Sequence, residues 1–216
     1  MLIYLAYISI FFRIFPTILQ WKASTRNHLG ARYFFLLCLI SVIADLLGIL
    51  FHYTKTNTDF VFNAYQIGEL VLVSLLVIEI GKFKSTGRAV VLFFCSIQIL
   101  IFLTLASLDK GEVLQDYMGG ISKLYVLIVL FISALNFIRN VGSEHHINVT
   151  PLIGLLGIFI FESLSIIPNI SMHLQRLFHN PQMITNIYLI FLISGNVIRD
   201  VLLSYHAIRC IKNSPR

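Results

Sequence analysis

Seven long apolar runs follow one another along this chain of 216 residues. Each is long enough to cross the ~30 Å hydrocarbon core of a bilayer as a helix with a rise of about 1.5 Å per residue. No run alternates in the manner of barrel strands, and a spanning segment must satisfy its own backbone hydrogen bonds. The sequence therefore predicts an all-α membrane protein, a seven-transmembrane-helix bundle in a single polytopic domain over residues 1–216. The predicted spans are 2–20, 33–53, 60–81, 89–108, 119–138, 151–172 and 183–207.

The charge content agrees with this class. Only 12% of the residues are charged and 57% are hydrophobic, whereas a soluble domain has ~25% charged residues. The formal net charge of +6 lies mostly in short strips between the apolar runs, where it suits anchoring beside anionic lipid. We therefore expect the lipid bilayer as a partner and no nucleic acid. Short loops and a basic tail favour a bacterial inner (plasma) membrane.

The distribution of lysine and arginine predicts the orientation, because cytoplasmic loops are enriched in these residues. Ten of them fall in one set of loops and three in the opposite set, which places the N-terminus outside and the C-terminus in the cytoplasm. The first apolar run has no positively charged segment before it, so we interpret it as a retained helix. The larger set is Lys22, Arg26, Arg32, Lys82, Lys84, Arg88, Arg139, Arg209, Lys212 and Arg216, and the smaller is Lys55, Lys110 and Arg176.

Ionisable residues near the middle of several spans are the main functional signal. A charge there costs ~2.5–3.5 kcal/mol on insertion scales, so each should face the bundle interior and have a partner. Helical spacing places further polar residues on the same faces. The predicted ligand- or proton-binding residues are Arg13, Asp45, Glu69, Glu162, Tyr65, Gln66, His52 and Asn196. The alternative is that these side chains only hold the helices together.

Three of these residues are carboxylic acids, and Arg13 is the one mid-depth cation among them. If all were ionised, the interior would carry a net charge of −2, which a low dielectric disfavours. We therefore expect at least one of Asp45, Glu69 and Glu162 to be protonated near neutral pH, through desolvation and like-charge repulsion. Arg13 is the natural counter-ion of a carboxylate that stays ionised.

A weak internal repeat relates the two ends of the chain. Asp45 lies near the middle of the second span and Glu162 near the middle of the sixth. The third span begins with the segment 63–67, Asn-Ala-Tyr-Gln-Ile, and the seventh contains 186–190, Asn-Ile-Tyr-Leu-Ile. Three helices, an inverting fourth and three more would give a 3+1+3 parallel repeat, an arrangement found in transporters with a site near the midplane.

The segment 16–25, Pro-Thr-Ile-Leu-Gln-Trp-Lys-Ala-Ser-Thr, resembles the proline-containing stretch and basic loop of PQ-loop and SWEET-type transporters. The resemblance implies seven helices in the same 3+1+3 arrangement. It covers about ten residues and departs from the motif at Thr17, where that family has glutamine. The fifth span has no proline. We treat the likeness as one of architecture.

Several other classes of chemistry lack their residues. Retinal needs a lysine in the middle of the last span, where this chain has Asn196, and the intramembrane Lys123 lies near the outer end of the fifth span. No third ligand accompanies Asp45 and His52 to complete a zinc site. No Gly-x-Ser-x-Gly turn is present. We predict no metal and no cofactor.

Two functional hypotheses follow from the polar faces. In the first, the protein is a small permease-like protein that binds a small solute or a proton in a polar cavity at the midplane, with one of the carboxyl groups coupling to the substrate. In the second, it is a seven-helix receptor-like sensor or membrane interaction module that signals through a cytoplasmic protein partner. An intramembrane acid–base enzyme built on Asp45, Glu69 and His52 is a third, minor alternative.

Overall fold

The computed structural model describes residues 2–26, 28–54, 59–108, 118–141, 149–178 and 181–213, without the side chains of 2–9, 52, 59, 62, 118–119, 141 and 167–189. This part of the chain forms seven α-helices and one π-helical turn, with no strand. The prediction of an all-helical protein is therefore confirmed. The elements are α1 (Leu2–Ser24), α2 (Ala31–Tyr53), α3 (Asp59–Ile80), α4 (Ser85–Ser107), the π-helical turn η1 (Met118–Ser122), α6 (Lys123–Val141), α7 (Thr150–Phe178) and α8 (Pro181–Lys212).

Four of the helices contain stretches that are long and apolar enough to cross a membrane, which indicates an integral membrane protein. Their outward faces are apolar: on α4, Phe93 and Leu100 are 62% and 65% exposed, whereas Gln98 is 9% exposed. This distribution is the reverse of that in a soluble protein and suits a lipid environment. The four stretches are Ala31–Phe51, Asn63–Ile80, Ser85–Ser107 and Gly120–Asn140.

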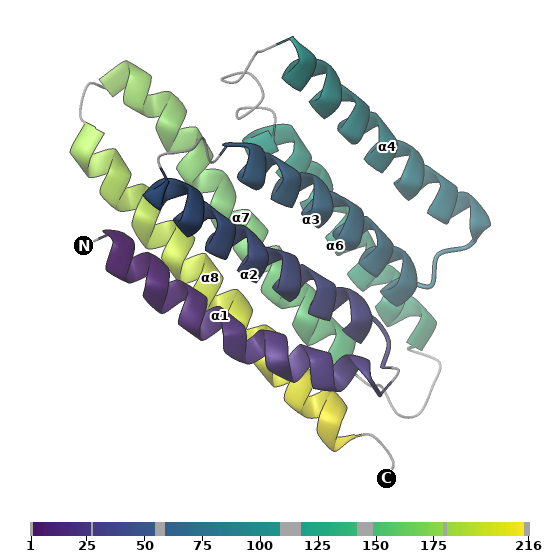
Figure 1. The fold of residues 1–216 in the computed structure, drawn as a ribbon. Coiled ribbons are helices and arrows are strands. Elements are labelled where there is room, and N and C mark those ends of the chain that lie inside the picture. Colours follow the sequence, from purple (N-terminus) through teal and green to yellow (C-terminus); the bar gives the residue numbers. More distant parts are fainter. Residues whose placement is uncertain are drawn as a thin grey trace.

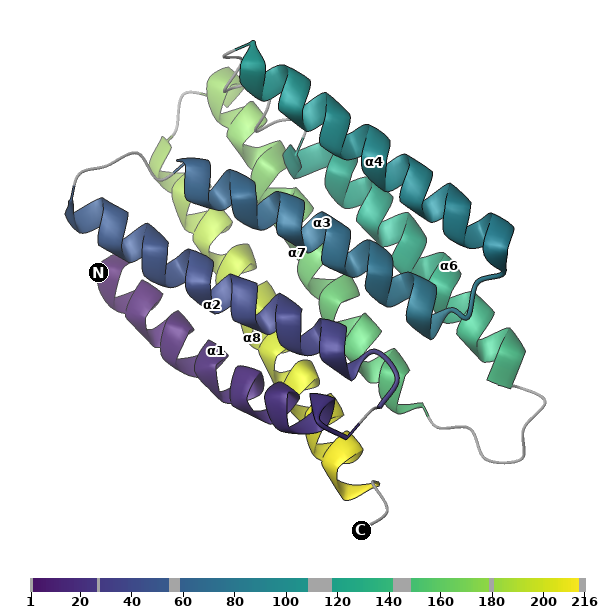
Figure 2. The same cartoon turned by 45° about the vertical axis from the view of Figure 1, so that its right-hand side comes forward.

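Six of the helices pack in a closed ring. Around it, α1 contacts α2, α2 contacts α3, α3 contacts α6, α6 contacts α7, α7 contacts α8, and α8 returns to α1. Helix α4 lies outside this ring along α3 (Figures 1 and 2). The Tyr125 hydroxyl of α6 also holds it, donating to the carbonyl of Val91 at 3.0 Å. The ring surrounds a space between six helices, into which their polar faces can point.

We call the end of the bundle where α1 and α8 terminate its C-terminal end; α1 begins at the opposite end (Figure 1). Apolar packing fills the ring there, around Phe34, Leu76, Ile80 and Leu130. Helix α7 approaches Phe34 so closely that a Cβ atom on Gly154 would lie 2.3 Å from its Cζ atom. The glycine therefore permits this contact between α7 and α2, which helps close the ring below the polar region.

A polar bridge crosses the same apolar end. The fully buried Gln20 of α1 donates through Nε2 to the carbonyl of Leu203 at 2.8 Å and contacts His206 Nδ1 at 3.0 Å. The Phe34 ring of α2 lies against the His206 ring, with centroids 4.5 Å apart. These contacts join α1, α2 and α8 beneath the polar region.

Candidate functional site

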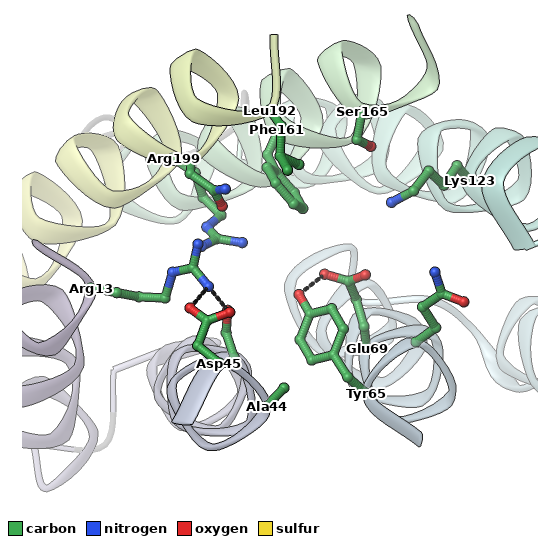
Figure 3. Close-up of a pocket in the computed structure, with 13 residues that line it drawn as sticks. Arg13, Ala44, Asp45, Tyr65, Glu69, Lys123, Phe161, Ser165, Leu192 and Arg199 are labelled. Carbon is green, nitrogen blue, oxygen red and sulfur yellow. Dashed lines mark hydrogen bonds and ion pairs between the residues drawn. The ribbon is translucent and has the colours of Figure 1, made fainter. Parts of the chain in front are cut away.

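A cavity of about 210 Å³ lies inside the ring. All six ring helices contribute side chains to its wall, and within the described residues α4 contributes none. Most of the residues that line it are polar or charged (Figure 3). The lining residues Arg13, Asp45 and Glu69 all come from near the middle of their helices, so the cavity is at mid-depth in the bundle.

Arg13 links α1 to α2 at one side of the cavity. Its side chain is only 6% exposed, and its Nη1 group donates to Ser41 Oγ at 2.8 Å and forms an ion pair with Asp45 Oδ2. The sequence places Arg13, Pro16 and Gln20 on one face of the helix, and all three are buried. Helical periodicity thus directs the guanidinium group inward, and α2 supplies its counter-ion.

A second arginine extends this ion pair onto α8. Arg199 donates from Nε and Nη2 to Asp200 Oδ1, both at 3.1 Å. Arg13 Nε lies 3.8 Å from the other oxygen of Asp200. The Arg199 guanidinium also lies over the Phe161 ring of α7, with Cζ 4.3 Å from the ring centroid. Two arginines and two aspartates therefore form one continuous network along α1, α2 and α8.

The α3 wall carries a carboxylate in a different setting. Tyr65 donates its hydroxyl to Glu69 Oε1 at 2.5 Å, one helical turn along the same helix. Both point into the cavity across from the arginines, as Figure 3 shows. Among the described side chains, Glu69 makes no ion pair. It is therefore the carboxylate of this site whose charge is least compensated.

A third ion pair joins α6 to α7. Lys123 Nζ lies 2.7 Å from Glu162 Oε2, and the Glu162 side chain is 1% exposed. Glu162 borders a small adjoining space of about 10 Å³ that it shares with Glu69 and Lys123, a volume suited to about one water molecule. The other carboxylate oxygen, Oε1, is buried and has no hydrogen-bond partner among the described residues.

The described charged side chains at the site therefore comprise three cations and four carboxylates. The sequence-based count of one cation and three acids was incomplete, because it left out Lys123, Arg199 and Asp200. The excess of negative charge is one rather than two. Protonation of one carboxyl group stays a prediction, and one proton would now suffice to neutralise the site.

The structure places most of the predicted ligand- or proton-binding residues at the cavity. Six of them line the cavity, and Glu162 lines the adjoining space; the side chain of His52 lies outside the described residues. Asn196 of α8 lines the cavity with a buried Oδ1 atom that has no hydrogen-bond partner in the described part of the chain. The six are Arg13, Asp45, Tyr65, Gln66, Glu69 and Asn196.

Sequence reasoning gave no site role to Lys123 or Phe161. Lys123 is the first residue of α6, near one end of the span, but its side chain carries the ammonium group to Glu162. A long lysine side chain can place its ammonium group well away from its own Cα atom along the helix surface. The length of the lysine side chain is therefore the sequence signal that could have indicated this pair. Phe161 precedes Glu162 directly, and nothing distinguishes it in sequence from the other phenylalanines.

The chain was compared with models of known protein families, with curated proteins and with solved structures, and none of them matches it.

Proposed function

We propose that the protein is a small permease of seven transmembrane helices that binds a small solute or a proton in the polar cavity. One observation carries this proposal: every helix of the ring contributes to a single charged cavity at mid-depth. Buried charges that served only as interhelical contacts could be distributed anywhere along the bundle. Polar groups that meet around an open space, in contrast, are typical of solute and ion pathways.

The packing order of the helices supports a 3+1+3 parallel repeat. Exchanging α1, α2 and α3 with α6, α7 and α8 leaves the order of the ring unchanged, and α4 lies outside it as a linker. The side chains follow the same exchange: Arg13 of α1 pairs with Asp45 of α2, and Lys123 of α6 pairs with Glu162 of α7. Transporters with such repeats bind substrate between the halves. Apart from Ile190, the side chains of the predicted 186–190 match lie outside the described residues.

The orientation that we propose rests on the basic residues. Nine of the ten predicted cytoplasmic lysines and arginines lie among the described residues, all at the C-terminal end of the bundle. Such enrichment is typical of the cytoplasmic side. The N-terminus would then be outside and the C-terminus in the cytoplasm, with the protein in a bacterial inner membrane.

A receptor-like sensor is the second candidate, and the contacts beneath the cavity favour it. Gln20, His206 and Phe34 couple α1, α8 and α2 between the cavity and the C-terminal end. Through this layer, a ligand bound in the cavity would shift the surface offered to a cytoplasmic partner. Both candidates use the same cavity but differ in whether the solute crosses.

Measurements of solute uptake distinguish the permease from the sensor. Thermal-shift screening of small solutes against the purified protein identifies ligands, and proteoliposomes with and without a pH gradient then test transport of each one. The permease proposal expects uptake that Asp45→Asn reduces strongly, because Arg13 loses the carboxylate of α2. The exposed Ser96 of α4 lies outside the cavity, so Ser96→Ala is the control. Binding without uptake of any ligand would overturn the permease and support the sensor.

A further inference from the structure

Two buried acceptor atoms at the cavity and its adjoining space lack a described donor. Glu162 Oε1 and Asn196 Oδ1 are buried without a donor among the described residues, and Glu69 receives one described hydrogen bond, from Tyr65. The two arginines, by contrast, direct donors at Asp45 and Asp200. Buried acceptors are costly unless a donor reaches them, so a ligand that suits this cavity brings donors.

The charges at the site also favour a ligand that carries N–H donors and a positive charge. Four carboxylates face three cations at the site, and Glu69 is the one of these four that has no ion pair among the described residues. A ligand with one positive charge would balance the site. An anion would need a free cation, and the described lysine and arginine side chains of the cavity are already paired with carboxylates.

From these two observations we propose that the solute is a small organic cation with N–H donors, a primary ammonium compound, whose ammonium group binds between Glu69 and Asn196. This inference rests on the proposed function and names the class of its substrate. An ammonium group offers three donors and one charge, which matches a carboxylate and an amide oxygen on facing helices. The cavity, at about 210 Å³, is smaller than the ~300–1,000 Å³ of drug-sized pockets, so the attached carbon skeleton is short.

A proton and the ammonium group compete for the same carboxylate. Once Glu69 is protonated it has lost the charge that holds the cation, so binding of the cation weakens as the pH falls. Binding of the cation to the protonated form must in turn release the proton of Glu69. The other titratable or charged groups that face Glu69 are Tyr65 on α3, Lys123 on α6, Glu162 on α7 and Arg199 on α8, with Arg13 and Asp45 across the cavity on α1 and α2. Ion pairs hold all of these except Tyr65, which leaves Glu69 as the site of exchange.

Isothermal titration calorimetry on the purified full-length protein tests this inference with propylammonium as the probe. Propylammonium is expected to bind more tightly at mildly alkaline than at mildly acidic pH, and titrations in two buffers of different ionisation enthalpy should show proton release. Tetramethylammonium, which has the charge but no N–H group, should bind far more weakly. Glu69→Gln should weaken propylammonium by about 10- to 100-fold, the usual worth of a charge-assisted hydrogen bond, and Glu69→Asp should recover part of the loss.

Glu79→Gln is the matched control. Glu79 lies on the same helix but outside the cavity, where it accepts a hydrogen bond from the Gly30 amide at 2.8 Å, and its replacement should leave affinity unchanged. Equal affinity for tetramethylammonium and propylammonium, or wild-type affinity in Glu69→Gln, would overturn the inference. So would binding and uptake of propionate in place of propylammonium, which would leave the permease intact. Propylammonium binding without uptake of any solute would have the opposite meaning, supporting the ammonium site and overturning the permease.

Discussion

Lys123 and Glu162 form a buried ion pair, Nζ to Oε2 at 2.7 Å, that fastens the first residue of α6 to the middle of α7. Glu162 is almost fully enclosed, and its second oxygen finds no partner among the described residues. Only one of the two carboxylate oxygens of Glu162 is therefore paired among the described residues. Removal of one charge of the pair should therefore destabilise the protein much more than removal of both charges.

Glu162→Gln should destabilise the protein by about 3–5 kcal/mol, because it leaves the Lys123 ammonium buried without its carboxylate. The double variant Glu162→Gln with Lys123→Met removes both charges and should recover most of that loss. Chemical unfolding in detergent measures the free energy of unfolding of the wild type, the single variant and the double variant. Equal destabilisation of the single and double variants would contradict this account of the pair.

Gly154→Ala should cost about 1–3 kcal/mol, the usual range for overpacking. The new methyl group would lie 2.3 Å from Phe34 Cζ, and the Phe34 ring is fully buried, so α7 must move away from α2. Gly120→Ala is the control, since nothing lies within 4 Å of its Cβ position. Thermal unfolding compares the two, and an unchanged midpoint for Gly154→Ala would contradict the close contact.

Gln20→Leu keeps the size of the side chain but removes its hydrogen bonds to α8. His206 Nδ1 then loses its described partner in a buried layer, and an unsatisfied buried group costs about 1–3 kcal/mol. We expect the free energy of unfolding to fall by that amount, and the midpoint of thermal unfolding to fall with it. Ser96→Ala, at an exposed position of α4, should change the stability by less than about 0.5 kcal/mol. Equal stability of both variants would mean that the bridge does not hold α1 to α8.

Cysteine labelling tests the proposed orientation. Cys38, Cys95 and Cys210 are all buried, so the unmodified protein should react weakly with a membrane-impermeant maleimide. Thr54 and Ser85 are exposed at opposite ends of the bundle. We expect Thr54→Cys to be labelled in intact cells and Ser85→Cys only after the membrane is permeabilised. The reverse pattern would place the N-terminus in the cytoplasm.

The helices were predictable from the sequence because apolar length alone determines them in a membrane. Each predicted run coincides with one helix, and the largest difference is at α7, which continues from 172 to 178. The polar end of α8 also extends past the predicted 207 to Lys212. Hydropathy predicts the part of a helix that lies in hydrocarbon, and it does not detect a polar extension of the helix beyond that part.

The site was predictable where backbone periodicity determines it. Arg13, Asp45 and Glu69 meet at one cavity because each lies near the middle of its helix on the polar face. The partners of these residues were harder to predict, because a contact between helices depends on which helices are neighbours. The position of α8 beside α1 brings Asp200 to Arg13, and no spacing within either span contains that information.

The place of α4 outside the ring has a consequence for how the chain can be divided. Helices α1 to α3 and α6 to α8 supply all the described walls of the cavity, and α4 packs against them from outside the ring. A break at α4 would therefore interrupt the polypeptide without opening the ring. We expect that two fragments made from separate genes, one ending after α3 and one beginning before α6, would reassemble in the same membrane into a complete cavity.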